Sequence, residues 1–265
     1  MTHSAAQSIL IEAQAPYSIY GTLYPQAPQN SATNTDTDTD ADKKLIINVH
    51  GLTQSQWGYL QINCLTTFNE AGYDVFNFSF YDRLPKSRRM SKSTLSTHKD
   101  DLERVIAHFR DQYDAIYLTG HSLGGLVTLL LNPADIKAVS LWDPSFDVTH
   151  LWTITNCLTH LSDRNAYILD YGAEYVLNAD MVEELKDYPN DACLKEAADF
   201  SSPTQMVIPE LSIFLASPHT SPAQYDEVFT APYERKTLTQ TDHCFYGQGK
   251  DQELFAETLS WFNRF

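Results

Sequence analysis

Cysteine and glycine are scarce in this chain of 265 residues, which has four of the first and ten of the second. The cysteines, Cys64, Cys157, Cys193 and Cys244, form no Cys-x-x-Cys pair, and their spacing matches no metal-ligand motif. We therefore expect no bound metal and no other cofactor. Reduced thiols are the expected state, and a Cys157–Cys193 disulfide is the alternative if the protein is exported.

Basic residues are outnumbered, with 18 Lys and Arg against 34 Asp and Glu, a formal net charge of −16 and a pI of about 4.8. Nucleic acids and anionic membrane surfaces repel such a protein, so neither is an expected partner. No run of 18 apolar residues is present, which predicts no stable membrane insertion. The N-terminal MTHSAAQSILIEAQ lacks the basic start and long apolar run of a signal peptide, so we predict a cytoplasmic location.

One segment, NSATNTDTDTDADKK (residues 30–44), is polar and of low complexity. It cannot bury apolar surface, which predicts a solvated loop. The alternating Asp36, Asp38 and Asp40 raise the alternative of a calcium site. The glycine and the distal glutamate of a calcium-binding loop are missing, so we predict no metal here.

Between this segment and residue 144, apolar strand-like runs alternate with amphipathic helical segments. The strand-like runs are KLIINV, DVFNFSFYD, AIYLTGHS and IKAVSLWDP. This order is typical of a parallel sheet with helices on both faces. The run YSIYGTLYP (residues 17–25) would add antiparallel strands at one edge. The sequence therefore predicts an α/β protein with a mostly parallel central sheet flanked by helices.

The alternation lapses over residues 146–204, where MVEELKDY and DACLKEAADF look helical and no clear central strand is found. We predict a helical lid inserted here, after the sixth strand. Residues 1–145 and 205–265 then form the two parts of the core. The second part contains the strand-like MVIPELSIFLAS and YERKTLTQT and the closing helix DQELFAETLSWF.

Three of the ten glycines, Gly120, Gly124 and Gly125, lie within the eight residues TGHSLGGL (residues 119–126). They surround Ser122 in a Gly-x-Ser-x-Gly pattern between a predicted strand and a predicted helix. Serine on such a tight turn has a strained backbone and an exposed hydroxyl, and the glycines let the strand and the helix approach. The helix N-terminus offers backbone N–H groups to an oxyanion. We therefore predict that Ser122 is a catalytic nucleophile.

GHSLGG and the order of elements resemble the α/β-hydrolase family over most of the chain. GHSLGG is similar to the nucleophile elbow of that family, and INVHGLTQS (residues 47–55) to the loop after its third strand. TDHCFYGQGKDQELFAETLSWF (residues 241–262) is similar to its C-terminal histidine loop and last helix. The resemblance implies an oxyanion hole made by the backbone N–H groups of Leu52 and Leu123. It also implies a general base after the final strand, which is His243.

The triad acid departs most from the family pattern. The family usually places it after the strand that begins in MVIPELSIFLAS, but the first eight residues of the next loop, SPHTSPAQ, contain no carboxylate. Asp143 ends the preceding strand-like run, and this placement resembles pancreatic-type lipases. We predict Asp143 as the acid. Asp226, Asp147 and Glu227 stay open, because the chain order serine, acid, histidine permits all four.

These residues predict a serine hydrolase that cleaves carboxylic esters with a small, medium or aromatic acyl group through an acyl-enzyme. Apolar side chains of the predicted lid would line the substrate pocket. The same triad would serve a thioesterase or an amidase, and a non-catalytic binding protein on a hydrolase scaffold is a further alternative. The expected partner is thus a small-molecule ester, and the sequence leaves the oligomeric state open.

Overall fold

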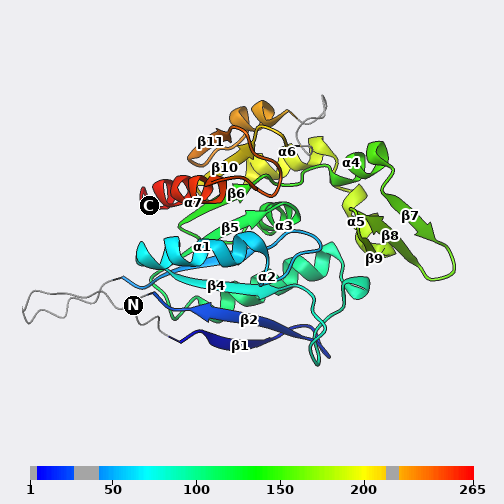
Figure 1. Cartoon of the computed structure of the whole chain (residues 1–265), viewed down its shortest axis with the longest axis horizontal. Helices are drawn as coiled ribbons and strands as arrows, with labels where there is room; N and C mark the ends of the chain where they lie inside the picture. The colour runs from blue at the N-terminus through cyan, green and yellow to red at the C-terminus, as the bar shows by residue number, and fades with distance from the viewer. Residues whose placement is uncertain (1–4, 27–41, 213–220) are drawn as a thin grey trace, which may run out of the picture.

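A computed structural model describes residues 5–26, 42–212 and 221–265 (Figure 1). In these residues an eight-stranded sheet has the order β1-β2-β4-β3-β5-β6-β10-β11. β1 and β2 pair antiparallel at one edge, β2 pairs antiparallel with β4, and all other pairs are parallel. The strands are β1 (Gln7–Glu12), β2 (Ser18–Tyr24), β3 (Lys44–Val49), β4 (Asp74–Ser79), β5 (Ala115–His121), β6 (Ala138–Trp142), β10 (Thr204–Pro209) and β11 (Tyr233–Leu238).

Helices cover both faces of this sheet, as the alternation of the sequence predicts (Figure 1). Apolar residues of α1 (Tyr59–Glu70) and α7 (Lys250–Phe262) form one buried cluster with the sheet. Those of α2 (Leu95–Phe109) and α3 (Leu123–Leu131) belong to the cluster on the other face. In α2 the buried positions recur every three or four residues, so one helical stripe faces the sheet. The predicted α/β fold with a mostly parallel sheet is therefore confirmed.

The segment between β6 and β10 contains helices, as expected, but it also contains a small sheet that the prediction of a helical lid did not include. It contains α4 (Val148–Thr155), α5 (Ala179–Lys186) and α6 (Asn190–Asp199) together with a three-stranded antiparallel sheet. The strands are β7 (Leu158–Leu161), β8 (Ala166–Asp170) and β9 (Glu174–Asn178). Each has four or five residues and buries at most two side chains, so the sequence carries almost no period-two signal.

Other predictions from composition have mixed outcomes. All four cysteines are free thiols, so the alternative Cys157–Cys193 disulfide is not formed. No helix in the described residues is long and apolar enough to cross a membrane. Most of the predicted polar loop at residues 30–44, including Asp36, Asp38 and Asp40, lies outside the described residues. The strand expected in residues 206–217 ends at Pro209, and residues 213–220 also lie outside the described part.

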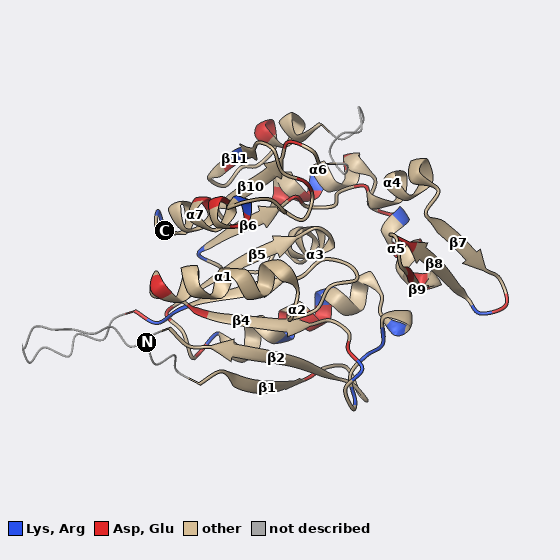
Figure 2. Ribbon diagram, in the orientation of Figure 1, with Lys and Arg blue, Asp and Glu red and all other residues tan. Residues whose placement is uncertain are grey.

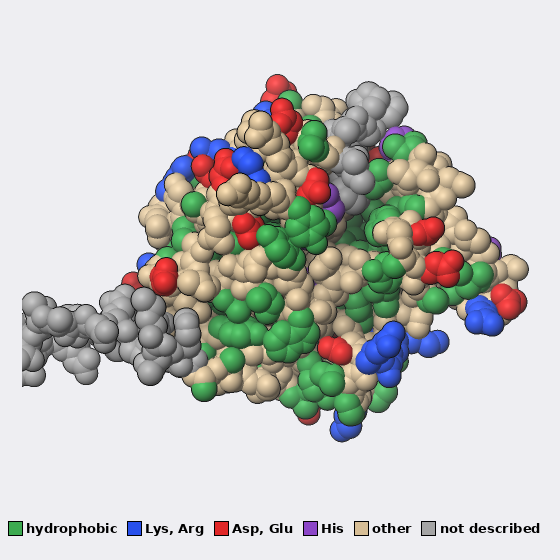
Figure 3. Space-filling view, in the orientation of Figure 1, with side chains coloured by type: hydrophobic (Ala, Val, Ile, Leu, Met, Phe, Trp, Pro, Cys, Tyr) green, Lys and Arg blue, Asp and Glu red, His purple; other side chains and the backbone are tan. Residues whose placement is uncertain are grey.

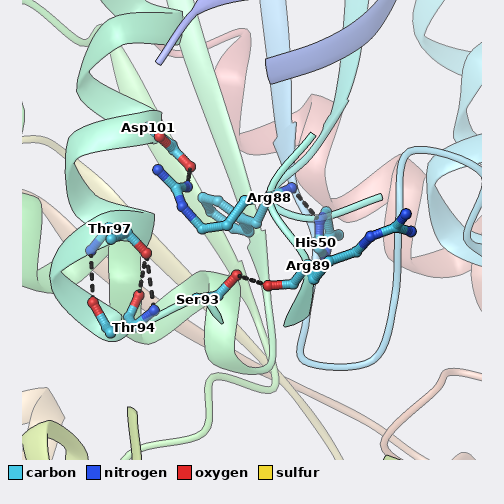
Figure 4. A network of polar contacts seen from close by, with 8 residues as sticks. His50, Arg88, Arg89, Ser93, Thr94, Thr97 and Asp101 are labelled. Atoms are coloured by element: carbon cyan, nitrogen blue, oxygen red, sulfur yellow. Dashed lines mark hydrogen bonds and ion pairs between the residues drawn. The ribbon is translucent and has the colours of Figure 1, made fainter. Parts of the chain in front are cut away.

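A buried ion pair ties the segment after β4 to helix α2 (Figure 4). The side chains of Arg88 and Asp101 are 3% and 1% exposed, and an Arg88 Nη1–H donates to Asp101 Oδ2. Both nitrogens of the neighbouring His98 ring are buried without a hydrogen-bond partner in the described residues. Burial lowers the pKa of His98 far below its ordinary value, so this ring is neutral and supplies no charge to the pair. Arg88 and Asp101 therefore depend on one another.

We expect Asp101→Asn to lower the free energy of unfolding by about 3–5 kcal/mol, because it leaves a buried guanidinium without its counter-charge. Urea denaturation measures this loss. The matched control is Asp100→Asn, since Asp100 is exposed on the same helix and should change stability by less than about 0.5 kcal/mol. Similar losses in the two variants would show that the Arg88 contact contributes nothing specific.

Candidate active site

Ser122 lies at the turn between β5 and α3, and its backbone has φ 55° and ψ −124°. A positive φ is strained for a residue with a Cβ, and such strain persists only where the surroundings hold it. The flanking glycines make this packing possible. A Cβ on Gly124 would lie 2.3 Å from the Val49 carbonyl oxygen, and one on Gly120 would lie 2.9 Å from the Gly125 Cα. This close approach of α3 to β3 and β5 accounts for the concentration of scarce glycine around one serine.

His243 and Asp143 are brought together by β11 and β6. The Nδ1–H of His243 donates to Asp143 Oδ2 at 2.7 Å, while the His243 side chain is 20% exposed and that of Asp143 fully buried. Asp143 follows the last residue of β6 with φ 41°, which turns its carboxylate toward the loop after β11. The hydrogen bond sets the ring tautomer, with the proton on Nδ1 and Nε2 left as the basic nitrogen.

Two serines that the sequence did not single out contact this group. The Ser212 hydroxyl donates to the second carboxylate oxygen, Asp143 Oδ1, at 2.7 Å. The Ser145 hydroxyl lies 2.9 Å from the Ser122 hydroxyl, and the Ser145 N–H donates to the Ser122 carbonyl at 3.0 Å. Neither serine belongs to a motif or a spacing pattern, so only the folded chain reveals them. They satisfy buried polar atoms and hold the segments that carry Ser122 and Asp143 in place.

The three alternative acids differ from Asp143 in their surroundings. Asp226 accepts two hydrogen bonds from the Arg235 guanidinium, both at 2.8 Å, and this partner lowers its pKa. Glu227 is exposed at the end of the 3₁₀ helix η2 (Pro222–Glu227). Asp147 stands at the start of α4 with φ 52°. In the described residues Asp143 is the only carboxylate with a hydrogen bond of 2.6–3.2 Å to His243.

A cavity of about 440 Å³ is bordered by four of the five predicted site residues. Its lining includes Ser122, His243, Leu52 and Leu123. The loop that carries Leu52 packs tightly on Ser122, since a Cβ on Gly51 would lie 2.8 Å from the Ser122 Cβ. Leu123 is the first residue of α3, where a backbone N–H has no partner within the helix. Both N–H groups thus belong to segments that border the Ser122 hydroxyl. The cavity is completed by Thr53, Gln54, His121, Ser145, Val148, Tyr171, Tyr175 and Cys244.

Two further histidines, His50 and His121, are buried around the site. Both are neutral, and their rings form hydrogen bonds with the backbone of neighbouring loops. Burial lowers the pKa of His50 to about 4 and that of His121 to about 3. The His50 Nδ1–H donates to the Gly51 carbonyl at 2.7 Å, and its Nε2 accepts the Phe80 N–H at 3.0 Å. The His121 Nε2–H donates to the carbonyl of His243 at 2.9 Å. His121 therefore ties the turn of the nucleophile to the loop of the predicted base.

The described residues contain no cluster of His, Cys, Asp or Glu that could hold a metal ion. The Ser122 hydroxyl contacts Ser145, and the His243 imidazole borders the same cavity as Ser122. A hydroxyl on a strained turn, an imidazole with a fixed tautomer and a buried carboxylate are the groups required for acyl transfer.

The chain is similar to known proteins both in sequence pattern and in fold. A family model described as "Alpha/beta hydrolase family" matches residues 47–256. No curated protein sequence matches the chain. The fold is similar to Est1E from Butyrivibrio proteoclasticus with ferulic acid bound, with a TM-score of 0.70, 18% identity and coverage of 96% of this chain and 99% of that one. It is also similar to the esterase domain of a Rhodothermus marinus protein, with a TM-score of 0.69, 16% identity and coverage of 98% and 99%.

Another similar structure is the α/β hydrolase GrgF from Penicillium sp. sh18, with a TM-score of 0.72, 14% identity and coverage of 98% of this chain and 99% of that one. At these identities the likeness shows the fold.

Proposed function

This chain belongs to the α/β-hydrolase family, and from that premise we propose that it is a serine hydrolase that cleaves carboxylic esters through an acyl-enzyme. The observation that carries the proposal is the 2.7 Å contact between His243 Nδ1 and Asp143 Oδ2 beside the cavity that contains Ser122. A neutral serine hydroxyl is a weak nucleophile and needs such an oriented base.

In the proposed mechanism, His243 Nε2 takes the proton of the Ser122 hydroxyl while its oxygen attacks the ester carbonyl. The backbone N–H groups of Leu52 and Leu123 stabilise the oxyanion of the tetrahedral intermediate. Asp143 holds the imidazole tautomer and stabilises the imidazolium that forms. His243 then gives its proton to the leaving alcohol, and water releases the acid from Ser122 by the same steps in reverse order.

The hydrogen bond between Ser122 and Ser145 fits the resting state of this mechanism. Ser145 is 1% exposed, and its backbone N–H also holds the carbonyl of Ser122. Its hydroxyl can keep that of Ser122 in one position before substrate binds. Ser145 therefore acts in the proposal as a positioning residue for the nucleophile.

The insertion at residues 146–204 supplies Tyr171 and Tyr175 to the cavity, and we propose that it acts as a lid. The Tyr171 hydroxyl accepts a hydrogen bond of 2.5 Å from the Trp152 Nε1–H, which fixes one of these rings. Two aromatic rings, one of them fixed, beside a cavity of about 440 Å³ suit an aromatic or a short to medium acyl group. The ferulic acid in the structure of Est1E is an aromatic acid and supports the same substrate class.

We expect p-nitrophenyl esters of short and medium acyl chains to be hydrolysed with kcat/KM of about 10⁴ M⁻¹s⁻¹ or more, and long chains much more slowly. Stopped assays over graded chain lengths measure this. A fluorophosphonate probe should label Ser122, which peptide mass spectrometry locates.

Hydrolysis of the corresponding thioesters or anilides at a higher kcat/KM than the esters would favour a thioesterase or an amidase. Absence of both labelling and turnover would support a binding protein on a hydrolase scaffold.

A further inference from the structure

The ten residues after Asp82 form a basic segment in an acidic protein. Residues 83–92, RLPKSRRMSK, hold five of the 18 basic residues and no carboxylate, although the chain has a formal net charge of −16. Figure 2 shows these cations between β4 and α2, on the side of the molecule that carries β9. Arg88 is buried, whereas the other four cations are exposed. In the space-filling view, Lys and Arg side chains at this side of the molecule lie on the same face as the hollow that contains a histidine side chain (Figure 3). We call residues 83–92 the basic segment.

The basic segment has a defined conformation because its ends are tied down. Arg88 pairs with Asp101 in the core, and the Ser87 hydroxyl donates to the Asp82 carbonyl at 2.7 Å. The Ser93 hydroxyl donates to the Arg89 carbonyl at 3.2 Å. Figure 4 shows Arg88 and Arg89 extending in opposite directions, the first toward α2 and the second away from it. Arg89 is therefore presented outward by a neighbour that is fixed in the core.

A second cavity of about 440 Å³ lies between the basic segment and the insertion. Arg83 and Arg89 line one side, and Glu174, Tyr175 and Val176 of β9 line the other. Tyr175 also lines the cavity that contains Ser122, so this residue borders both spaces. A substrate chain that passes Tyr175 would reach both guanidinium groups.

Both guanidinium groups lack a carboxylate partner among the described residues. The contact of Arg89 is a hydrogen bond of 3.4 Å to the carbonyl of Asp82, and Arg83 makes no ion pair. Two carboxylates also line the cavity: Asp82, which already accepts the Arg83 backbone N–H, and the exposed Glu174. In a chain where carboxylates outnumber cations, two unpaired guanidinium groups at one cavity suit an external anion.

The sheet order indicates which part of an ester would reach this cavity. Ser122 follows β5; the basic segment follows β4 on one side, whereas Asp143 and His243 follow β6 and β11 on the other. His243 protonates the leaving alcohol in the proposed mechanism, so the alcohol lies on its side of Ser122. The acyl chain then extends toward β4 and the basic segment.

We propose that the substrate is an ester whose acyl chain carries a carboxylate, and that Arg83 and Arg89 bind this carboxylate. The proposal rests on the proposed ester hydrolysis and deepens it by naming the substrate class. The arginines determine specificity: they contact the substrate at a distance from the reacting bond and leave the chemistry at Ser122 unchanged.

The test uses mono-4-nitrophenyl esters of straight-chain dicarboxylic acids of graded length, each compared with the same compound whose distal carboxylate is a methyl ester. At the best length, kcat/KM for the anionic ester should exceed that of its neutral partner by about tenfold, and added NaCl should reduce the ratio. The double variant Arg83→Gln/Arg89→Gln should remove the preference and leave kcat/KM for the neutral ester unchanged, which also shows that the variant folds.

The matched control is Arg110→Gln/Lys137→Gln, which removes the same charge from two exposed positions outside these cavities. It should retain the preference. Equal kcat/KM for the anionic and neutral esters, or an equal loss of preference in both double variants, would overturn the inference while ester hydrolysis stands. A preference for carboxylates in the alcohol part would also overturn it. No hydrolysis of any ester would overturn the proposed function itself.

Discussion

Ser122→Ala is expected to lower kcat for ester hydrolysis by about a million-fold, because the remaining groups of the site cannot form the acyl-enzyme. The alanine keeps the Cβ that the strained turn already accommodates, so the fold should be retained. Thermal unfolding and the far-UV circular dichroism spectrum check the fold, and turnover of a short p-nitrophenyl ester measures the loss.

The matched control is Ser145→Ala, whose hydroxyl is 2.9 Å from that of Ser122. It removes a positioning hydrogen bond but no reacting group, so we expect a loss of about tenfold. If Ser122→Ala lost no more activity than Ser145→Ala, Ser122 would not be the nucleophile.

Asp143→Asn is expected to lower kcat by about four orders of magnitude at neutral pH. Asparagine has nearly the same shape and tolerates the φ of 41° at this position, so the backbone is preserved. Its amide N–H, however, can donate to His243 Nδ1, and the ring then carries its proton on the nitrogen that should accept one from Ser122. Steady-state kinetics over pH measures the loss, and a crystal structure of the variant verifies the contact.

Asp226→Asn is the control for the same chemical change, since Asp226 pairs with Arg235 away from the cavity. It should leave kcat within about twofold, because a partly exposed ion pair contributes little.

Ser212→Ala removes the hydrogen bond that Ser212 donates to Asp143 Oδ1. We expect this variant to lower kcat by about tenfold, because one hydrogen bond to the carboxylate is lost. Retention of activity in Asp143→Asn, with a loss in Asp147→Asn or Glu227→Gln, would move the acid role to that residue.

The buried histidines determine the pH at which the Ser122→Ala and Asp143→Asn variants should be compared. His50 and His121 are neutral in the folded chain, because burial lowers their pKa to about 4 and about 3. The unfolded chain binds protons at these rings below a pH of about 6.5, so stability falls as the pH drops from there toward 4. Comparisons between variants are therefore made at neutral pH, where this loss of stability is absent.

The sequence by itself determined the architecture and the tight turn at Ser122. Alternating strand and helix signals predict the parallel sheet, because helices that cover both faces make each strand a continuous apolar run. The glycines around Ser122 predict a close packing of strand and helix that only residues without a Cβ permit. Both features depend on residues that are close together in the chain, so a short stretch of sequence is enough to predict each of them.

The tertiary structure decided which side chains meet. His243 and Asp143 are 100 residues apart, and four carboxylates fitted the chain order until the folded chain placed Asp143 at 2.7 Å and paired Asp226 with Arg235. Ser145 and Ser212 carry no pattern in the sequence, since a hydrogen bond depends on position in space. The small sheet of the insertion was missed for a related reason. Its strands bury at most two side chains each, so their sequences show no alternation of apolar and polar residues. Their pairing with one another stabilises the extended conformation, and this pairing exists only in the folded chain.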